Sequence, residues 1–521
     1  MNVQQPVYDL VVIGGGINGC GIARDAAGRG LKVLLCEKDD LAQATSSAST
    51  KLFHGGLRYL EYFEFRLVKK ALEEREVLLR NMPHISWPMR FVLPHDPRLH
   101  YDNDATSLGK LLKYTLPFLR GRRPAWLIRA GLFLYDNLGG RKILPPTRVV
   151  KLAEDRTGAP LKPVYAKAFE YSDCWVDDAR LVVLNARDAV LHGADVVTRT
   201  ICEGAARENG HWRIDLRDVE TGQTRHVLSK GIVNAGGPWV EDILNGKLRQ
   251  NNRNGVRLVR GSHIVTRKLF DHDQPYFLQL RDGRIIFAIP YEQQFTLIGT
   301  TDHDHKGDPG KAVCTPEERQ YLLNAVNQFF ERQLADADIV WTYSGVRPLY
   351  DDGATSATAA TRDYVLTIGD SDEKLPVLSV FGGKITTYRK LAEEALKKLA
   401  PYFPEMTDPW TADAPLPGGD FEVHEVDDLI ARSRTDFPFL DHRTVTRMVR
   451  AYGTEVAKIF ANGPGEQLAP GLFQSELDWL IANEWVRDID DLLWRRSKLG
   501  LILTPAEQQD VAAALAKSRR N

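Results

Sequence analysis

The chain has 521 residues, of which 43% are apolar and 26% charged, and its formal net charge is -1. Such a length exceeds what one hydrophobic core usually serves, so we expect two or three domains. The balanced charge argues against a nucleic-acid-binding protein, and five scattered cysteines without a C-x-x-C pair argue against a zinc site or a disulfide framework.

The first apolar run begins at Tyr8, which leaves no room for a signal or transit peptide ahead of it. No stretch reaches the roughly 18 apolar residues of a membrane-spanning helix. We therefore expect a cytoplasmic protein that is attached at most to the surface of a membrane.

Residues 8–38, YDLVVIGGGINGCGIARDAAGRGLKVLLCEK, predict a strand, a glycine turn, a helix that ends near Gly30 and a second strand. Gly14, Gly16 and Gly19 form a G-x-G-x-x-G pattern, in which glycine permits a tight turn and close approach of the backbone to a pyrophosphate. Glu37 ends the second strand, where a carboxylate accepts hydrogen bonds from ribose hydroxyls. This unit predicts dinucleotide binding and favours FAD or NAD over NADP.

The next elements are predicted from the charge pattern of a helix and from the alternation of apolar and polar residues that is typical of strands. Residues 66–80 predict a helix, and residues 178–230 predict a helix followed by a β-meander with turns at Asn209-Gly210 and Thr221-Gly222. Residues 231–240, GIVNAGGPWV, predict a strand that closes on another glycine turn. In residues 256–302 apolar and polar residues alternate on both sides of an Asp282-Gly283 turn. This pattern predicts an antiparallel sheet that forms one wall of a site.

Two later segments of the chain carry signals for the start of a helix. Thr315, Pro316 and Glu318 predict a capped helix start. Residues 379–396, SVFGGKITTYRKLAEEAL, predict a strand, a glycine pair and a helix whose amino end suits an anionic or electron-rich group. Beyond about residue 400 the pattern is helical and charged, and it suggests no chemistry of its own.

Several blocks of this sequence resemble the FAD-dependent, quinone-reducing glycerol-3-phosphate dehydrogenases, within the amino-acid-oxidase-like flavoproteins. They are VIGGGINGCGIARDAAGRGL, ATSSASTKLFHGGLRYLEYFEFRLV, EYSDCWVDDARLV, GSHIV, IGTTD, WTYSGVRPL, TRDY and SVFGGKITTYRKLAE. The resemblance implies an α/β fold with a Rossmann-like FAD-binding domain, an antiparallel-sheet substrate domain and a C-terminal helical domain. We assign residues 1–90, 165–245 and 340–400 to the first, 91–164 and 246–339 to the second, and 401–521 to the third.

The resemblance implies oxidation of sn-glycerol 3-phosphate to dihydroxyacetone phosphate, with electrons passing through noncovalently bound FAD to ubiquinone. Two alternatives remain open: an oxidase that passes the electrons to oxygen, and a noncatalytic flavin-binding scaffold. No metal is expected.

The matching blocks supply candidate contacts for the substrate phosphate. A phosphate monoester carries about 1.5 to 2 negative charges near neutral pH, and arginine's planar fork matches its oxygens. We predict that Arg58, Arg347 and Arg362 bind the substrate and that Tyr59 lines the site. Arg347 is also a candidate catalytic residue.

Two residues compete for the role of base toward the substrate hydroxyl. His263 has an intrinsic pKa close to working pH, and we favour it slightly. Lys384 is the rival, because neighbouring arginines and a flavin can depress the pKa of a lysine; it also serves as a candidate substrate-binding cation.

The predicted cofactor contacts come from the glycine turns and the blocks around them. His54 is interpreted as a packing and electrostatic neighbour of the flavin, not as a covalent attachment point, and Thr387 is a weaker candidate beside Thr386. The contacts are Gly14, Gly15, Gly16, Asn18, Gly19, Glu37, Thr45, Ser46, Ser47, His54, Gly55, Gly56, Gly236, Gly382, Gly383 and Thr386.

The part least typical of the resembled family is residues 100–126, which look longer than the corresponding segment of its members, and a basic segment, residues 107–142, overlaps them. Between Lys110 and Lys142 eight basic residues accompany one acid, Asp136, amid leucine and aromatic residues. Such a segment suits an anionic lipid surface, and the alternative is a solvated helix pair over the substrate domain. We expect a protein on the inner face of the cell membrane, and a homodimer is a further prediction.

Overall fold

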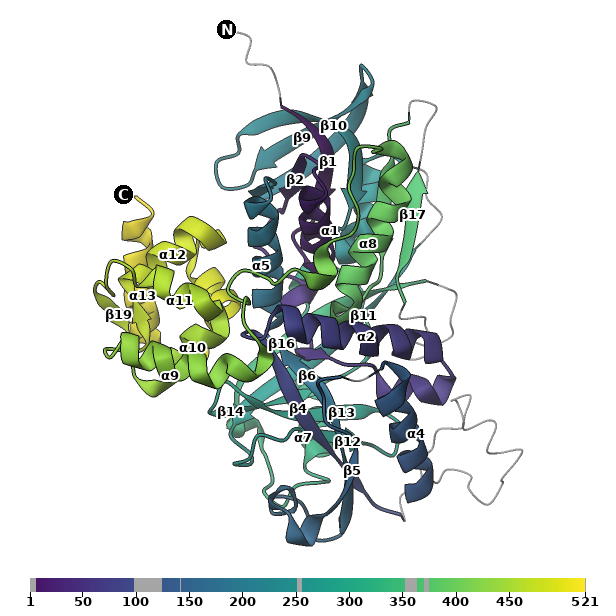
Figure 1. Ribbon diagram of the computed structural model, residues 1–521, viewed down its shortest axis with the longest axis vertical. Helices are drawn as coiled ribbons and strands as arrows, with labels where there is room; N and C mark the ends of the chain where they lie inside the picture. The colour runs from purple at the N-terminus through teal and green to yellow at the C-terminus, as the bar shows by residue number, and fades with distance from the viewer. Residues whose placement is uncertain are drawn as a thin grey trace.

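The computed structural model describes residues 6–97, 124–140, 142–250, 255–351, 363–369 and 374–520. Within these residues Figure 1 shows a sheet with helices at the top, a second sheet with helices below it, and a helical lobe at the side. This mixed architecture confirms the predicted fold class.

The first sheet has a parallel centre, in which β1 lies between β10 and β2, β10 pairs with β18, and β2 pairs with β7. Antiparallel β17 closes one edge, and the antiparallel pair β8–β9 extends β10. Its strands are β1 (Val7–Ile13), β2 (Val33–Cys36), β7 (Asp195–Val197), β8 (Thr200–Glu208), β9 (His211–Asp218), β10 (Thr224–Asn234), β17 (Val365–Gly369) and β18 (Val377–Phe381). The predicted strand–helix–strand unit and β-meander are both confirmed.

Three helices cover this sheet. They are α1 (Ile17–Gly28), α5 (Asp178–Leu191) and α8 (Tyr388–Leu399), with α1 packed against the other two. Leu10, Val11 and Val12 of β1 are fully buried, because a central parallel strand is covered on both faces. The glycine turn after β1 is therefore held on a rigid, buried base.

The second sheet is mainly antiparallel and runs in the order β15-β11-β14-β13-β12-β4-β6-β3, with β16 on β11 and β5 on β6. Its strands are β3 (Leu52–Phe53), β4 (Ser86–His95), β5 (Arg148–Lys151), β6 (Lys167–Val176), β11 (Val256–Arg267), β12 (Tyr276–Gln279), β13 (Ile285–Tyr291), β14 (Phe295–Gly299), β15 (His303–Asp304) and β16 (Ile339–Tyr350). The predicted hairpin turn at Asp282-Gly283 joins β12 to β13, with Gly283 at φ 77°. The domain limits set from the sequence stay a prediction; β4 and β16 run across two of them.

Three helices accompany this sheet: α2 (Phe65–Asn81), α4 (Ala125–Leu138) and α7 (Pro316–Val326). The start of α7 confirms the predicted capping box. The Thr315 hydroxyl accepts from the Glu318 N–H at 3.3 Å, and the Glu318 carboxylate accepts from the Thr315 N–H at 3.1 Å.

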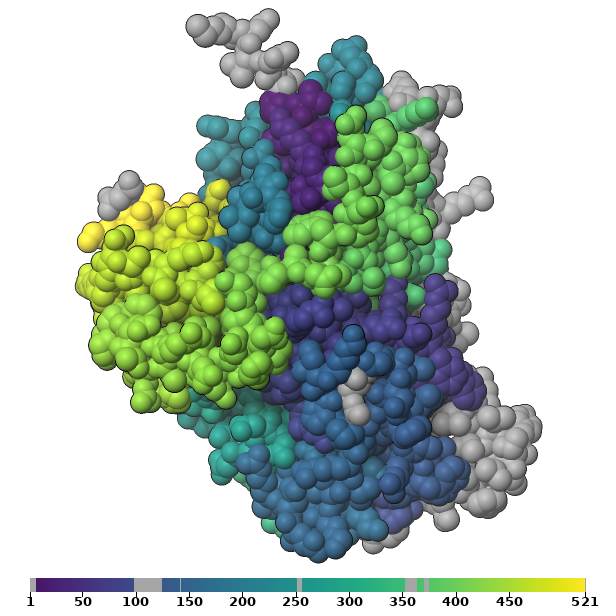
Figure 2. Space-filling view, in the orientation of Figure 1, coloured from purple at the N-terminus to yellow at the C-terminus, as the bar shows by residue number. Residues whose placement is uncertain are grey.

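The C-terminal part forms a helical lobe that Figure 2 shows in green to yellow beside both sheet domains. It has its own apolar core, with Met448, Leu472 and Leu480 fully buried. Its helices are α9 (Val426–Asp436), α10 (His442–Tyr452), α11 (Val456–Ile459), α12 (Gln474–Glu484), the π-helix η15 (Asp491–Arg496) and α13 (Pro505–Ser518), with a strand pair β19 (Gln467–Ala469) and β20 (Leu472–Phe473). Among the described residues, no helix combines the length and the apolar character needed to cross a bilayer.

Candidate active site

A cavity of about 520 Å³ is lined by residues of both sheets. The first sheet contributes the turn after β1, the segment after β2 and the segment after β18. The second sheet contributes residues of β11, β13 and β16. A volume of this size is typical of small-molecule and cofactor sites.

The glycine turn between β1 and α1 leaves no room for side chains. Gly14 has φ +114°, and a Cβ atom there would lie 2.5 Å from the Ala235 carbonyl oxygen. A Cβ atom on Gly19 would lie 1.9 Å from the Gly14 carbonyl oxygen, so Gly19 lets α1 start directly against the turn. The amino end of α1 consequently faces the cavity with its backbone N–H groups, as an anion-binding helix terminus requires.

The Glu37 carboxylate lies beside this turn. Its Oε2 atom accepts from the Gly15 N–H at 2.6 Å, and its Oε1 atom accepts from the Asp39 N–H at 2.9 Å. Burial raises the pKa of Glu37, against the lowering effect of these two backbone donors. Each carboxylate oxygen keeps a further lone pair that can accept from a ribose hydroxyl.

A second pair of glycines brings the start of α8 to the cavity. Gly382 and Gly383 have φ of +76° and +105°, which lets the chain turn sharply after β18. The Asn18 side chain donates to the Gly382 carbonyl oxygen at 3.2 Å, and the Thr386 hydroxyl accepts from the His54 N–H at 3.3 Å. These contacts tie three distant segments into one wall.

Cationic side chains gather on the cavity wall. The Arg347 guanidinium donates to the Thr301 carbonyl oxygen at 3.0 Å and pairs with the Asp302 carboxylate. The Lys384 ammonium lies 3.9 Å from the centroid of the Tyr59 ring, a cation–π contact. Arg58 also lines the cavity. Arg362 lies outside the described residues, so its predicted role stays a prediction.

His263 also lines the cavity but is buried, with only 2% of its surface exposed. Its ring stacks on Tyr343 with the centroids 4.7 Å apart, and its other side meets Gly299, where a Cβ atom would lie 2.0 Å from Cδ2. Its Nε2 atom lies 3.0 Å from the Thr50 hydroxyl oxygen, and Thr50 itself lines the cavity. Burial, with Lys51 and Arg347 nearby, holds the pKa of His263 well below its usual range, so the ring is neutral at pH 7.

Most of the predicted site residues share this cavity. Gly14, Gly15, Gly16, Asn18, Glu37, Thr45, Ser46, His54, Gly56, Arg58, Tyr59, Gly236, His263, Arg347, Gly382, Gly383, Lys384 and Thr386 all line it. Among the described residues, three other predicted cofactor contacts do not line it. Gly19 packs behind the turn, the Ser47 carbonyl oxygen accepts from the Lys51 ammonium at 3.0 Å, and the Gly55 N–H donates to the Tyr135 hydroxyl at 2.7 Å. These three shape the surrounding backbone, and direct contact with a cofactor stays a prediction for them.

The structure also adds residues that the sequence analysis did not single out. Thr50 and Tyr343 orient His263, and Asp302 orients Arg347. All three occur within the blocks quoted for the resemblance, but nothing in a linear pattern shows which side chains meet across the cavity.

Comparison with known proteins identifies the family. A family model described as "FAD dependent oxidoreductase" matches residues 9–389, about three quarters of the chain. The chain belongs to the FAD-dependent oxidoreductases. A second model, described as "C-terminal domain of alpha-glycerophosphate oxidase", matches residues 409–518, which form the helical lobe.

Close relatives of this oxidoreductase cover almost all of its length. A glycerol-3-phosphate dehydrogenase from Pseudomonas aeruginosa is 51% identical over 96% of this chain and 94% of its own. A D-erythritol 1-phosphate dehydrogenase from Brucella abortus is 48% identical over 96% of each chain. The solved structure of a glycerol-3-phosphate dehydrogenase from Bacillus halodurans, complexed with FAD, is 26% identical, with a TM-score of 0.73, and covers 100% of this chain and 92% of its own.

FAD is the cofactor of this oxidoreductase, and the described residues fit it. The turn at Gly14 and Gly16 leaves an open cradle at the helix terminus for a pyrophosphate, and Glu37 is placed for a ribose. The Oδ1 atom of Asn18 is buried and has no hydrogen-bond partner among the described residues. A bound group with a donor would satisfy it.

Proposed function

We propose that this oxidoreductase converts sn-glycerol 3-phosphate to dihydroxyacetone phosphate and passes the electrons to ubiquinone. The observation that carries the proposal is that Arg347, Lys384 and His263, from three separate segments, all line the FAD cavity. The dehydrogenases from Pseudomonas aeruginosa and Bacillus halodurans, which are named for this substrate, support it.

The cations of this cavity suit a phosphate dianion. Arg58, Arg347 and Lys384 come from three separate segments, and each lines the cavity. A phosphate oxygen can take over the hydrogen bonds that Arg347 now makes to Thr301 and Asp302. The phosphate end of the substrate is thereby fixed, which leaves the carbinol carbon to be oriented by the remaining wall.

Removal of the hydroxyl proton requires a deprotonated base within hydrogen-bonding reach of that hydroxyl, directly or through one intervening group. His263 is neutral at pH 7, and its ring is held between Tyr343 and Gly299 with Nε2 toward Thr50. We propose His263 as the group that takes up the proton, directly or through the Thr50 hydroxyl. Bound FAD supplies the hydride acceptor.

The Brucella abortus relative shows that a closely similar chain acts on a longer polyol phosphate, so the substrate needs a direct test. We expect kcat/KM to be highest for sn-glycerol 3-phosphate, lower for D-erythritol 1-phosphate, and about a thousandfold lower for glycerol, which lacks the phosphate. Steady-state turnover of the FAD-loaded protein with a soluble quinone measures all three. A higher kcat/KM for D-erythritol 1-phosphate contradicts the proposed substrate, and failure of all three to bleach the flavin without air favours a noncatalytic scaffold.

The electron acceptor is tested in the same assay. After anaerobic reduction by the substrate, reoxidation by ubiquinone is expected to be much faster than reoxidation by air. Faster reoxidation by air, with peroxide as product, would favour the oxidase alternative.

We also propose that the enzyme docks on the inner face of the cell membrane through the region around α4. Trp126 and Phe133 of α4 are 57% and 70% exposed, and Phe63 and Phe65, just before and at the start of α2, which contacts α4, are 42% and 40% exposed. Residues 107–123 of the basic segment lie outside the described residues. Exposed aromatic side chains beside a basic segment suit the interface of an anionic bilayer.

This docking predicts binding to vesicles that contain anionic lipid and weaker binding to vesicles of phosphatidylcholine alone. Replacing Trp126 and Phe133 together by serine is expected to release most of the protein in a cosedimentation assay, without a change in turnover with a soluble quinone. Equal binding of the variant and the parent protein contradicts the assignment of this surface. A matched control replaces Val313, which is 66% exposed and follows β15 in the chain, by serine.

A further inference from the structure

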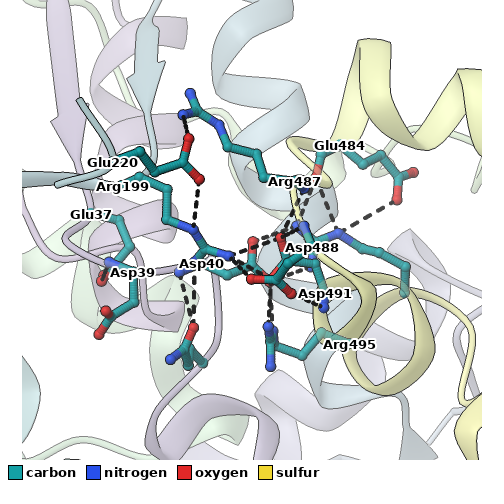
Figure 3. A network of polar contacts seen from close by, with 12 residues as sticks. Glu37, Asp39, Asp40, Arg199, Glu220, Glu484, Arg487, Asp488, Asp491 and Arg495 are labelled. Carbon is teal, nitrogen blue, oxygen red and sulfur yellow. Dashed lines mark hydrogen bonds and ion pairs between the residues drawn. The ribbon is translucent and has the colours of Figure 1, made fainter. Parts of the chain in front are cut away.

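The helical C-terminal lobe reaches the FAD cavity through the loop of residues 37–43, which follows β2 (Figure 3). Asp40 in this loop is 1% exposed, and the backbone around it lines the cavity. Both of its carboxylate oxygens accept hydrogen bonds from arginines of the lobe. The distances are 2.8 Å from Arg496 to each oxygen and 2.6 Å from Arg495 Nε to Oδ2.

The two arginines are neighbours on the π-helix η15 (Asp491–Arg496). Successive residues of an α-helix point about 100° apart, whereas here consecutive side chains reach the same carboxylate. π-Helical turns are rare and are frequently found at functional sites. Arg496 is fully buried and also donates to the Glu484 carbonyl oxygen at 3.1 and 2.6 Å, which fixes its fork toward Asp40.

A second contact joins the same helix to the same loop. Arg199 donates to the Asp491 carboxylate at 2.9 Å and to the Asp488 carboxylate at 2.5 Å. Its backbone N–H donates to the Asp39 carbonyl oxygen at 3.0 Å. Arg199 therefore also ties the start of η15 to the loop, and its contacts with the η15 carboxylates are drawn in Figure 3.

The loop in turn holds the parts that receive the cofactor. Glu37 accepts from the Gly15 N–H, and the Ala42 N–H donates to the Gly15 carbonyl oxygen at 3.1 Å. A displacement of Asp40 would thus move the ribose-binding carboxylate and the glycine turn together.

We propose that Arg495 and Arg496 are positioning residues for FAD, which act through Asp40 to hold the adenosine-binding loop in its binding conformation. The inference depends on FAD as cofactor and not on the proposed substrate. On this proposal the C-terminal lobe helps to retain the cofactor, although the lobe lies far from the glycine turn along the chain.

Stability alone does not account for this network. A buried ion pair is often no more stabilising than apolar residues of the same volume, because taking the charges out of water is costly. The bidentate hydrogen bonds of a guanidinium to a carboxylate do, however, add geometric specificity to the position of the loop. The network holds the loop of residues 37–43, whose position matters for the binding of FAD.

The test uses the full chain, stripped of FAD and titrated with FAD while flavin fluorescence is followed. Arg495→Gln is expected to raise the FAD dissociation constant about tenfold to a hundredfold, with kcat at saturating FAD close to that of the parent protein. Arg495 is the suitable site because its side chain is 12% exposed, so the change leaves no fully buried hole. The matched control is Arg519→Gln, because Arg519 pairs with Glu220 across the same boundary at 3.4 Å and is 39% exposed.

Some results of this titration would overturn the proposal. A parental dissociation constant in folded Arg495→Gln protein, or equal weakening in Arg519→Gln, overturns the proposal. A double-mutant cycle with Asp40→Asn adds a second measurement: the double variant should bind FAD no more weakly than the poorer single variant. If Asp40→Asn does not fold, Arg495→Lys is measured instead. Lysine keeps the positive charge but lacks the planar guanidinium, so its FAD dissociation constant is expected to lie between those of the parent protein and Arg495→Gln. If melting temperatures fall equally with and without FAD while the constant stays parental, the network is structural only and the proposal fails.

Discussion

Replacing Arg347 by alanine is expected to lower kcat/KM for sn-glycerol 3-phosphate by about 10²- to 10³-fold, while the FAD content of the purified protein stays unchanged. A charge-assisted hydrogen bond contributes about 1.5–3 kcal/mol, and a guanidinium can make two such bonds to one phosphate. Arg347 lies on β16 and lines the cavity, and its guanidinium contacts Thr301 and Asp302, which belong to neither the glycine turn nor the Glu37 loop. The loss should therefore appear in substrate use and not in flavin binding.

Two comparisons separate a phosphate contact from damage to the sheet. The slow oxidation of glycerol, which has no phosphate, should be nearly the same in the parent protein and in Arg347→Ala. Arg257→Ala serves as control, because Arg257 lies on the adjacent strand β11 and pairs at 2.7 Å with Asp304, a partner that is half exposed. An exposed pair of this kind contributes little, so kcat/KM should change about twofold at most. An Arg347→Ala enzyme with parental kcat/KM would remove the arginine from the phosphate site.

The sequence predicted those parts of the fold that depend on neighbouring residues. The strand–turn–helix unit around Gly14, the hairpin at Gly283 and the capping box of Thr315 each need only a few consecutive side chains with particular backbone preferences. The structure confirms these elements, which local sterics and hydrogen bonds favour from the sequence.

The contacts that build the site depend on residues far apart in the chain. Asp40 and Arg496 are separated by 456 positions, and Thr50 and His263 by 213. No periodicity links such pairs, so the sequence offered no chemistry for the C-terminal region although that region holds the loop beside Glu37. Gly55 and Gly56 illustrate the same limit on a smaller scale: they are neighbours, but Gly56 lines the cavity at φ +76° and Gly55 faces Leu72 and Tyr135.

The strongest test of the chemistry compares His263 with Lys384. His263→Asn is expected to lower kcat about 10²- to 10⁴-fold, the usual contribution of a general base. Lys384→Met is expected to raise KM more than it lowers kcat, if the lysine binds the phosphate as a cation. Tyr343→Phe is the matched control, because it keeps the ring stacked on His263 and loses only the hydrogen bond from the Tyr343 hydroxyl to the Ser49 carbonyl oxygen at 2.9 Å.

The dependence of kcat on pH then distinguishes the two bases, since kcat reports the enzyme–substrate complex. A base acts in its deprotonated form, and a lowered pKa keeps the base deprotonated down to a lower pH. Because burial and the nearby Lys51 and Arg347 lower the pKa of His263, kcat should stay on its plateau at neutral pH and fall only as the pH drops below 6.5. The His263→Asn enzyme should lose this acid limb, and the Lys384→Met enzyme should keep it. An acid limb above pH 7 that disappears in Lys384→Met would instead make Lys384 the base, with His263 left to orient the substrate through Thr50.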